Sequence, residues 1–295
     1  MATEATAERR SAGHRLADLF HGRPRLQVGA LLAGPVGWLV IGYLGSLLVL
    51  LIAAFWTVDP LSGELVHSLS FENFETLFEE PVYRSIVGRT VLIAALVTLT
   101  DAVLAFPIAF YMAKLASRRG KAILIVAILV PLWSSYLVKV LSWRTMLGNG
   151  GVIDWALEPF GLHGPGFGQT AVWLVMSYLW LPYMILPIYA GLERIPDSLI
   201  SASEDLGASP FTTFRRVILP LAFPAVVAGS IFTFALTLGD YITPRLVSND
   251  QFIGNVIFNN ISNNLPLASA LALVPIVVMV AYLLVARRLG AFEHL

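Results

Sequence analysis

The sequence predicts an all-α membrane protein that crosses the bilayer six times and keeps both termini in the cytoplasm. The composition is the first observation behind this prediction, because 57% of the 295 residues are hydrophobic and only 13% are charged. An ordinary soluble protein carries about 25% charged residues. The formal net charge is zero, so nothing favours nucleic acid as a partner, and the absence of cysteine excludes disulfides and thiolate metal sites.

Six apolar stretches provide the second observation, since each is long enough for a spanning helix, which takes about 20 residues. They lie at roughly 30–56, 90–113, 122–142, 170–191, 221–243 and 266–286. Pro131, Pro182 and Pro187 interrupt the third and fourth stretches, and spanning helices tolerate proline where neighbouring groups satisfy the freed carbonyls. The first stretch is too long for a signal-peptide core and is predicted to remain as an anchor.

The distribution of basic residues provides the third observation. With the N-terminus inside, 14 of the 19 lysines and arginines fall on the cytoplasmic side, whereas the outer loop 59–83 has six acids and no lysine or arginine. This bias follows the positive-inside rule and sets the orientation. The sequence therefore predicts a cytoplasmic N-terminal tail over 1–27 and a transmembrane domain over 28–290.

The longest cytoplasmic loop, 191–220, contains the compact polar segment SASEDLGASPFTTFRRVILP. Pro196 and Asp197 are typical of a helix start, and Gly207 is typical of a helix end in the left-handed conformation. Ser209 and Pro210 predict the N-cap and first turn of a second short helix. That helix would lead into the fifth span and would carry Phe211, Phe214, Val217 and Ile218, with Pro220 at the entry to the span.

One loop cannot cover all the apolar side chains of this segment, which include Leu199, Leu206, Phe211 and Phe214. Two short helices with a glycine corner would make a projecting knob suited to a groove in another protein. The alternative is a surface loop that packs on its own membrane domain.

The segment resembles the cytoplasmic coupling loop of bacterial ABC-importer permeases, whose EAA motif is Glu-Ala-Ala, three residues, Gly, nine residues and an Ile-x-Leu-Pro ending. Ser201-Ala202-Ser203 takes the Glu-Ala-Ala position, Gly207 follows at the family's spacing, and 217–220 read VILP. The family's glutamate is Ser201 here, with Glu204 three positions later. The resemblance implies that an ATPase groove receives Ser201, Ala202, Ser203, Glu204, Asp205, Leu206, Gly207, Ala208, Phe211, Phe214, Leu219 and Pro220.

Residues 68–288 also resemble spermidine/putrescine-type permeases through LSFENFETLF, PLWSSYLVKVLSWRTMLGNGGVID, LGDYITPRLV and IGNVIFNNI. The resemblance implies the type I importer fold in a bacterial inner membrane. It also implies a homologous second permease, two ATPase subunits that bind ATP and magnesium, and an extracytoplasmic solute-binding protein. The implied substrate is a polyamine or a similar small organic solute; an amino acid, opine, phosphonate, iron or sugar is the alternative.

The chain lacks the phosphate-binding loop that ATP hydrolysis would require. The single Gly-Lys pair, Gly120-Lys121, is followed by Ala122 instead of Ser or Thr. No metal-ligand spacing is present either, so we expect no enzymatic activity, metal or cofactor in this chain. A gradient-driven secondary transporter is an alternative, but it predicts inverted repeats and leaves the coupling-loop spacing unexplained. A membrane scaffold or sensor would need a soluble domain.

Charged residues at bilayer depth cost about 2.5–3.5 kcal/mol on insertion scales, which makes them candidates for a substrate pathway. Asp101 lies near the middle of the second span, either as a cation-facing carboxylate or as a helix–helix hydrogen-bonding group with Thr98, Thr100 or a partner helix. Asp240 and Tyr241 end the fifth span. A carboxylate beside an aromatic ring suits an organic cation, and an interfacial anchor with a turn is the alternative.

Other polar residues are open to two interpretations. Trp133, Ser134, Ser135 and Tyr136 either line a polar cavity or make interhelical hydrogen bonds. Asn255, Asn259 and Asn263 would share one helix face that contacts the binding protein or lines the entry, unless they lie in a hydrated loop. In the outer loop, an amphipathic stripe is predicted to lie along the membrane surface as a structural element, with Phe71, Phe74, Leu77 and Phe78 on its apolar face.

Overall fold

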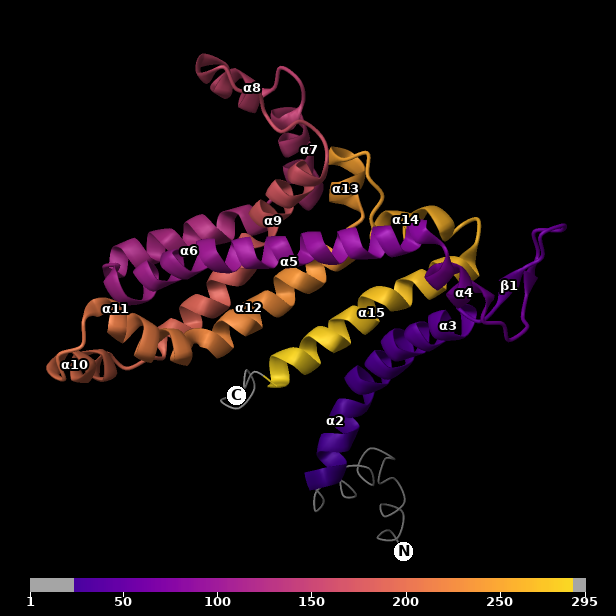
Figure 1. Ribbon diagram of the computed structural model, residues 1–295. Coiled ribbons are helices and arrows are strands. Elements are labelled where there is room, and N and C mark those ends of the chain that lie inside the picture. Colours follow the sequence, from indigo (N-terminus) through magenta and orange to yellow (C-terminus); the bar gives the residue numbers. More distant parts are fainter. Residues whose placement is uncertain (1–23, 289–295) are drawn as a thin grey trace, which may run out of the picture. The chain divides into compact units, whose positions relative to one another are not determined.

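The computed structural model describes residues 24–288 as an almost entirely helical protein (Figure 1). Residues 1–23 of the predicted tail and residues 289 and 290 of the predicted transmembrane domain lie outside this range. The described chain divides into two units, one ending at Ala53 and the other beginning at Ala54.

The first unit is a helical stretch made of α2 (Pro24–Trp38), a π-helical segment η1 (Leu39–Leu44) and α3 (Gly45–Ala53). Residues Leu31–Ala53 are long and apolar enough to cross a membrane, which confirms the first predicted span. Large apolar side chains such as Leu31 and Ile41 are exposed within this unit, as expected for a helix whose surroundings are lipid.

The second unit contains four further straight or gently bent candidate spans. They are α5 with η2 (Pro81–Phe110 and Tyr111–Leu115), α9 (Gln169–Glu193), a helix from Pro210 to Gly239 and α15 (Leu265–Arg288). The helix from Pro210 to Gly239 comprises α11 (Pro210–Thr213), η4 (Phe214–Ile218) and α12 (Leu219–Gly239). These four confirm the second, fourth, fifth and sixth predicted stretches. The second, fourth and sixth are longer at both ends, whereas the fifth begins earlier than predicted, at Pro210, and ends earlier, at Gly239.

The third predicted span, 122–142, is not a single straight helix. α6 (Arg118–Trp133) and α7 (Tyr136–Leu147) meet at a bend of 92°. The carbonyl of Pro131 at this break accepts hydrogen bonds from Ser134 Oγ at 2.8 Å and Lys139 Nζ at 3.1 Å. These side chains supplement the hydrogen bond of 3.3 Å that the Ser134 N–H donates to the same carbonyl. The described residues contain five candidate spans, or six if this bent pair counts as one.

The core of the second unit lies where α5, α9 and α12 pack against one another, as Figure 1 shows. The buried face of α5 carries small residues, including Ala94, Ala105 and Ala109, which allow helices in a membrane to approach closely. Gly229 of α12 has the same effect, because a Cβ added there would lie 2.7 Å from Sδ and 3.2 Å from Cα of Met184 in α9.

Short elements occupy the ends of the helices on the predicted outer side. A hairpin of β1 (Thr57–Val58) and β2 (Leu65–Val66), which the all-α prediction did not include, precedes α4 (Glu72–Glu79). The remaining short helices are α8 (Val152–Leu157), η3 (Glu158–Phe160), α13 (Ile242–Val247) and α14 (Ile253–Asn260).

Helix α4 carries the predicted amphipathic stripe, but part of that stripe belongs to the protein core. Leu77 is buried in a cluster with Ile86, Ile253 and Leu271. The Asn73 side chain on the same helix is also buried and donates to the carbonyls of Ala54 and Trp56. An element lying only on the membrane surface would bury neither group.

The predicted asparagine face on the outer side is wrong. Helix α14 ends at Asn260, so Asn263 lies beyond it. Asn255 is buried whereas Asn259 is exposed, so the two side chains do not present one common surface.

The close approach of α12 to α9 predicts that alanine is tolerated less well at Gly229 than at Gly88. Replacing either Gly229 or Gly88 by Ala gains about 1 kcal/mol of helix propensity, and a Cβ at Gly88 meets nothing within 4 Å. At Gly229 the added methyl group overpacks Met184, which typically costs about 1–3 kcal/mol. We therefore expect Gly229→Ala to unfold in detergent at lower temperature than Gly88→Ala; equal melting temperatures would contradict this packing.

Candidate functional site

The predicted corner of the cytoplasmic loop is present. Helix α10 (Asp197–Asp205) ends before Gly207, which has a φ of +79°, a left-handed conformation that glycine adopts without penalty. Ser209 then caps the next helix by accepting a hydrogen bond from the Thr212 N–H at 3.3 Å, and Pro210 occupies the first turn. These features confirm the predicted helix, glycine and N-cap.

The second helix of the loop is not a separate short helix. It begins at Pro210 and continues without interruption to Gly239, a length of 30 residues. Pro220 therefore lies inside a continuous helical stretch, where η4 passes into α12. At 1.5 Å per residue, this helix extends about 45 Å from the loop to the far end of the span.

The tip of the loop exposes apolar side chains, with Leu206 88% and Phe211 70% exposed and Leu199 also on the surface. Phe214 differs from the prediction, because it packs inward against Phe106 of α5 in an edge-to-face contact at 5.5 Å. Of the other residues assigned to the coupling loop, Ser203 and Ala208 are half-buried, and the exposed ones are Ser201, Ala202, Glu204, Asp205, Leu219 and Pro220.

Two contacts that the sequence did not reveal attach the loop to the membrane domain. Ser203 and the buried Thr213 share a hydroxyl hydrogen bond of 3.0 Å, which joins α10 to α11. Lys114 at the end of η2 donates to the Ile195 carbonyl at 2.6 Å and to the Asp197 carboxylate at 2.7 Å. Its hydrogen bond and its positive charge hold the pKa of the Asp197 carboxyl below the usual range.

A cavity of 360 Å³ lies near the other end of the same long helix. It brings together Tyr136 of α7, Trp180 of α9 and Asp240 with Tyr241 after α12. Three of these four residues were predicted for a substrate pathway, from stretches of the chain about 100 residues apart. The remaining lining residues are apolar or glycine: Ala235, Leu236, Gly239 and Ile242.

The Asp240 carboxylate is held by neutral donors. One oxygen accepts from the backbone N–H groups of Ile242 at 2.9 Å and Thr243 at 3.2 Å, which caps α13. The other oxygen accepts from the hydroxyls of Tyr136 and Thr243. The cap corresponds to the predicted turn, and the tyrosine contact ties α7 to the end of α12.

Aromatic rings surround this carboxylate. Tyr136 stacks on Trp180 with 5.9 Å between ring centroids and 14° between planes. Tyr241 stacks on Phe258 at 4.7 Å, and the Arg245 guanidinium lies 5.1 Å from the centre of the Phe258 ring. The cavity thus combines one acidic group with three aromatic residues.

The other residues predicted for the pathway do not line this cavity. Trp133 and Ser135 are exposed at the bend between α6 and α7, and Asn255 is buried beneath Tyr241, where its amide donates to the Tyr241 carbonyl at 3.4 Å. Asn259 is exposed on α14.

Asp101 is fully buried in α5, at 0% exposure, and neither carboxylate oxygen has a hydrogen-bond partner among the described residues. The expected bonds to Thr98 and Thr100 are absent. Thr98 donates to the Ala94 carbonyl, whereas Thr100 accepts from the Trp173 indole at 3.0 Å.

Trp180 and Thr243 are the site residues that sequence reasoning missed. Thr243 follows Asp240 at the spacing of an N-cap and its third helical residue, a pattern that could have indicated the cap. Trp180 lies in an apolar stretch whose periodicity gives no hint of the cavity. No cluster of three or more His, Cys, Asp or Glu residues that could hold a metal ion occurs within 24–288.

Residues 85–292 match the family described as the binding-protein-dependent transport system inner membrane component. The chain is 43% identical over 299 residues to the inner membrane ABC transporter permease protein YdcU of Escherichia coli (strain K12), covering 95% of each chain. It is 30% identical over 260 residues to the spermidine/putrescine transport system permease protein PotB of the same organism, covering 85% of this chain and 93% of PotB.

Solved structures agree on the fold. A bacterial ABC transporter involved in the import of the acidic polysaccharide alginate has a chain that superposes with a TM-score of 0.70 at 17% identity, covering 93% of this chain and 98% of that chain. The inward-facing MetNI methionine ABC transporter gives a TM-score of 0.55 at 17% identity, with coverages of 70% and 94%. The chain therefore belongs to the binding-protein-dependent transport system inner membrane component family and is a multi-pass permease subunit of an ABC importer.

Proposed function

We propose that this permease subunit imports a small organic cation of the polyamine class across a bacterial inner membrane. The observation that carries the proposal is the lining of the cavity near the end of α12. Asp240 is the only charged residue among the lining residues, and Tyr136, Trp180 and Tyr241 surround it. Aromatic faces attract ammonium groups, by about 0.5–2 kcal/mol each depending on desolvation.

The hydrogen bonds to Asp240 do not cancel its charge. All four donors are neutral, and no lysine or arginine of the described chain lies within 4.0 Å of the carboxylate. An entering ammonium group would therefore meet a carboxylate that has no direct ion-pair partner and is held in a fixed position. The similarity to the spermidine/putrescine permease PotB supports the same substrate class.

We further propose that energy reaches this subunit through the 191–220 loop from separate ATPase subunits, which bind ATP and magnesium. The exposed Leu199, Leu206 and Phe211 provide an apolar contact surface on the loop. One helix then connects the loop to the cavity, so a displacement of Pro210 is passed directly to Gly239. A homologous second permease and an extracytoplasmic binding protein would complete the assembly.

The substrate proposal predicts the effect of Asp240→Asn. Asparagine keeps the cap of α13, since it is as good an N-cap as aspartate, but it removes the negative charge. We expect the half-saturating concentration for spermidine or putrescine uptake to rise about tenfold, which corresponds to about 1.4 kcal/mol, in proteoliposomes containing the complete transporter.

Asp154→Asn is the matched control for that change. Asp154 also accepts from backbone N–H groups, those of Gly150 and Gly164, but it lies in α8 and does not line the cavity. Its substitution should leave uptake unchanged. Equal uptake by the unmodified protein and the Asp240 variant would exclude a cation-binding role for Asp240.

The coupling proposal predicts that Leu206→Asp weakens ATPase binding. This side chain is 88% exposed at the loop tip, so the change should not disturb folding, but it places a charge in an apolar contact. We expect co-purification of the ATPase subunit and uptake to fall at least about tenfold. Leu61→Asp, at a position 98% exposed on the predicted outer side, is the control; an equal response of both variants would contradict the assignment.

The contacts that Lys114 makes with the loop predict that replacing it destabilises the protein more than replacing Lys121 does. The side chain of Lys114 is 10% exposed and bridges two groups at the start of the loop, whereas Lys121 is 27% exposed, donates one hydrogen bond to Glu193 and lies over the Tyr189 ring. Lys114→Met should lower the free energy of unfolding by about 1–3 kcal/mol, and Lys121→Met by less than about 1 kcal/mol. Thermal unfolding of the purified permease measures both.

The lowered pKa of Asp197 determines the pH range over which its pair with Lys114 stabilises the protein. The pair with Lys114 contributes fully above the ordinary carboxyl pKa of 3.8, and its contribution is lost only as the pH falls through the lower pKa of the folded state. The difference between the two variants should therefore stay constant across neutral pH; a difference that vanished there would contradict the ion pair.

A further inference from the structure

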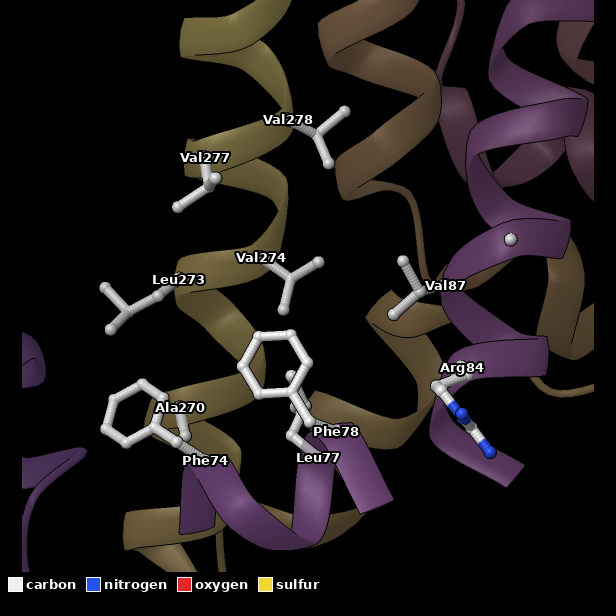
Figure 2. A pocket seen from close by; sticks show the side chains of 11 residues that line it. Phe74, Leu77, Phe78, Arg84, Val87, Ala270, Leu273, Val274, Val277 and Val278 are labelled. Atoms are coloured by element: carbon white, nitrogen blue, oxygen red, sulfur yellow. The ribbon is translucent and has the colours of Figure 1, made fainter. Parts of the chain in front are cut away.

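We propose that the groove between α4, α5 and α15 binds a phospholipid of the outer leaflet, with an acyl chain in the groove and the phosphate at Arg84. This inference does not depend on which substrate the transporter imports. Figure 2 shows Phe74, Leu77 and Phe78 of α4 at one end of the groove. Val87 lies on the α5 side, and the α15 side is lined by Ala270, Leu273, Val274, Val277 and Val278.

The groove has the size and chemistry of a ligand site. Its volume is 520 Å³, within the roughly 300–1,000 Å³ typical of small-molecule pockets. From Ala270 to Val278 it follows α15 for about 12 Å, at 1.5 Å per residue. Apart from Arg84, every lining residue is apolar or glycine.

Because α5 and α15 are candidate membrane spans and the groove lining is apolar, an acyl chain is the natural apolar occupant. The hydrophobic effect contributes little to the free energy of lipid binding there, because the surrounding lipid tails are as apolar as the groove itself. Selective binding of one lipid therefore requires a polar contact at the headgroup. Arg84 supplies that contact.

Arg84 lies in the first turns of α5, on the side that the distribution of basic residues assigns to the outside. Its side chain is exposed and, within residues 24–288, no carboxylate lies within 4.0 Å of it, whereas Arg89 on the same helix pairs with Asp250 at 3.2 Å. In Figure 2 the guanidinium lies at the α4 end of the groove and is directed away from its interior. A guanidinium binds phosphate with two parallel hydrogen bonds.

The acidic residues beside the groove favour a zwitterionic headgroup. Glu79 and Glu80 are exposed between α4 and α5, close in the chain to Arg84. Phosphatidylethanolamine would place its phosphate at Arg84 and its ammonium group toward these carboxylates. A purely anionic headgroup would be repelled by the same acids.

Gly88 gives access to the groove on the α5 side. A Cβ added there would meet no atom within 4 Å, so the position opens onto empty space. A large side chain at this position should fill the groove without displacing the helices.

The test uses the complete transporter in native-composition lipid nanodiscs and a phosphatidylethanolamine carrying a photoreactive diazirine in its acyl chain. We expect labelling of α15 peptides that contain Val274 and Val277. Diacylglycerol with the same diazirine chain, which lacks the phosphate, should label them about tenfold less. Gly88→Phe and Arg84→Gln should each reduce phosphatidylethanolamine labelling by a similar factor.

Val103→Phe is the matched control, because it enlarges an apolar side chain on α5 that is 64% exposed outside the groove. It should leave labelling unchanged. Equal labelling by the two lipids, or unchanged labelling in both groove variants, would overturn the proposal. Since the chain has no cysteine, Val277→Cys introduces a single thiol; its efficient cross-linking to another subunit would show a protein interface and also overturn the proposal.

Discussion

The bilayer offers no water to unpaired backbone groups, and this constraint determines most of the fold. Every spanning segment is helical because only a helix satisfies all its own N–H and C=O groups in hydrocarbon. Where a helix breaks, side chains add hydrogen bonds to the exposed backbone, as Ser134 and Lys139 do at the Pro131 carbonyl. Polar chemistry is consequently concentrated at the helix ends, in the cavity on one side and the loop on the other. Inside the spans, polar groups are fewer; they include the Trp173–Thr100 hydrogen bond and Asp101, a buried carboxyl group without a partner in the described chain.

One continuous helix connects the cytoplasmic loop to the cavity. The helix from Pro210 to Gly239 begins at the capped corner of the loop and ends beside Asp240. Its middle is held tightly, because Gly229 leaves no room for a side chain against Met184. Its ends are held by polar contacts, with Ser203 bonded to Thr213 at one end and Asp240 bonded to Tyr136 at the other. The helix is thus fixed by close packing in its middle and by hydrogen bonds near both ends.

Local signals in the sequence predicted the parts of the structure that depend on local chemistry. The lengths of the apolar stretches predicted the straight spans. Gly207, Ser209 and Pro210 predicted the corner of the loop, because left-handed glycine and helix caps depend on few neighbouring residues. Residues whose positions depend on tertiary packing could not be placed in this way. Phe214 lies inward because Phe106, more than 100 positions earlier, receives it. Trp180 lines the cavity because it meets Tyr136 and Asp240, and Asn255 is buried because it packs beneath Tyr241, so both positions depend on tertiary contacts. The 92° bend could not be predicted either, because the sequence does not show which donors reach the Pro131 carbonyl.

The exposed apolar tip of the loop has a consequence for how the protein must be produced. Leu206 and Phe211 stay uncovered in the isolated subunit, and uncovered apolar surface in an aqueous compartment promotes aggregation. Copies synthesised in excess of their covering partner would therefore be substrates for chaperones and proteases. Balanced synthesis of the subunits, and not the intrinsic stability of the membrane helices alone, would set the cellular abundance of this chain.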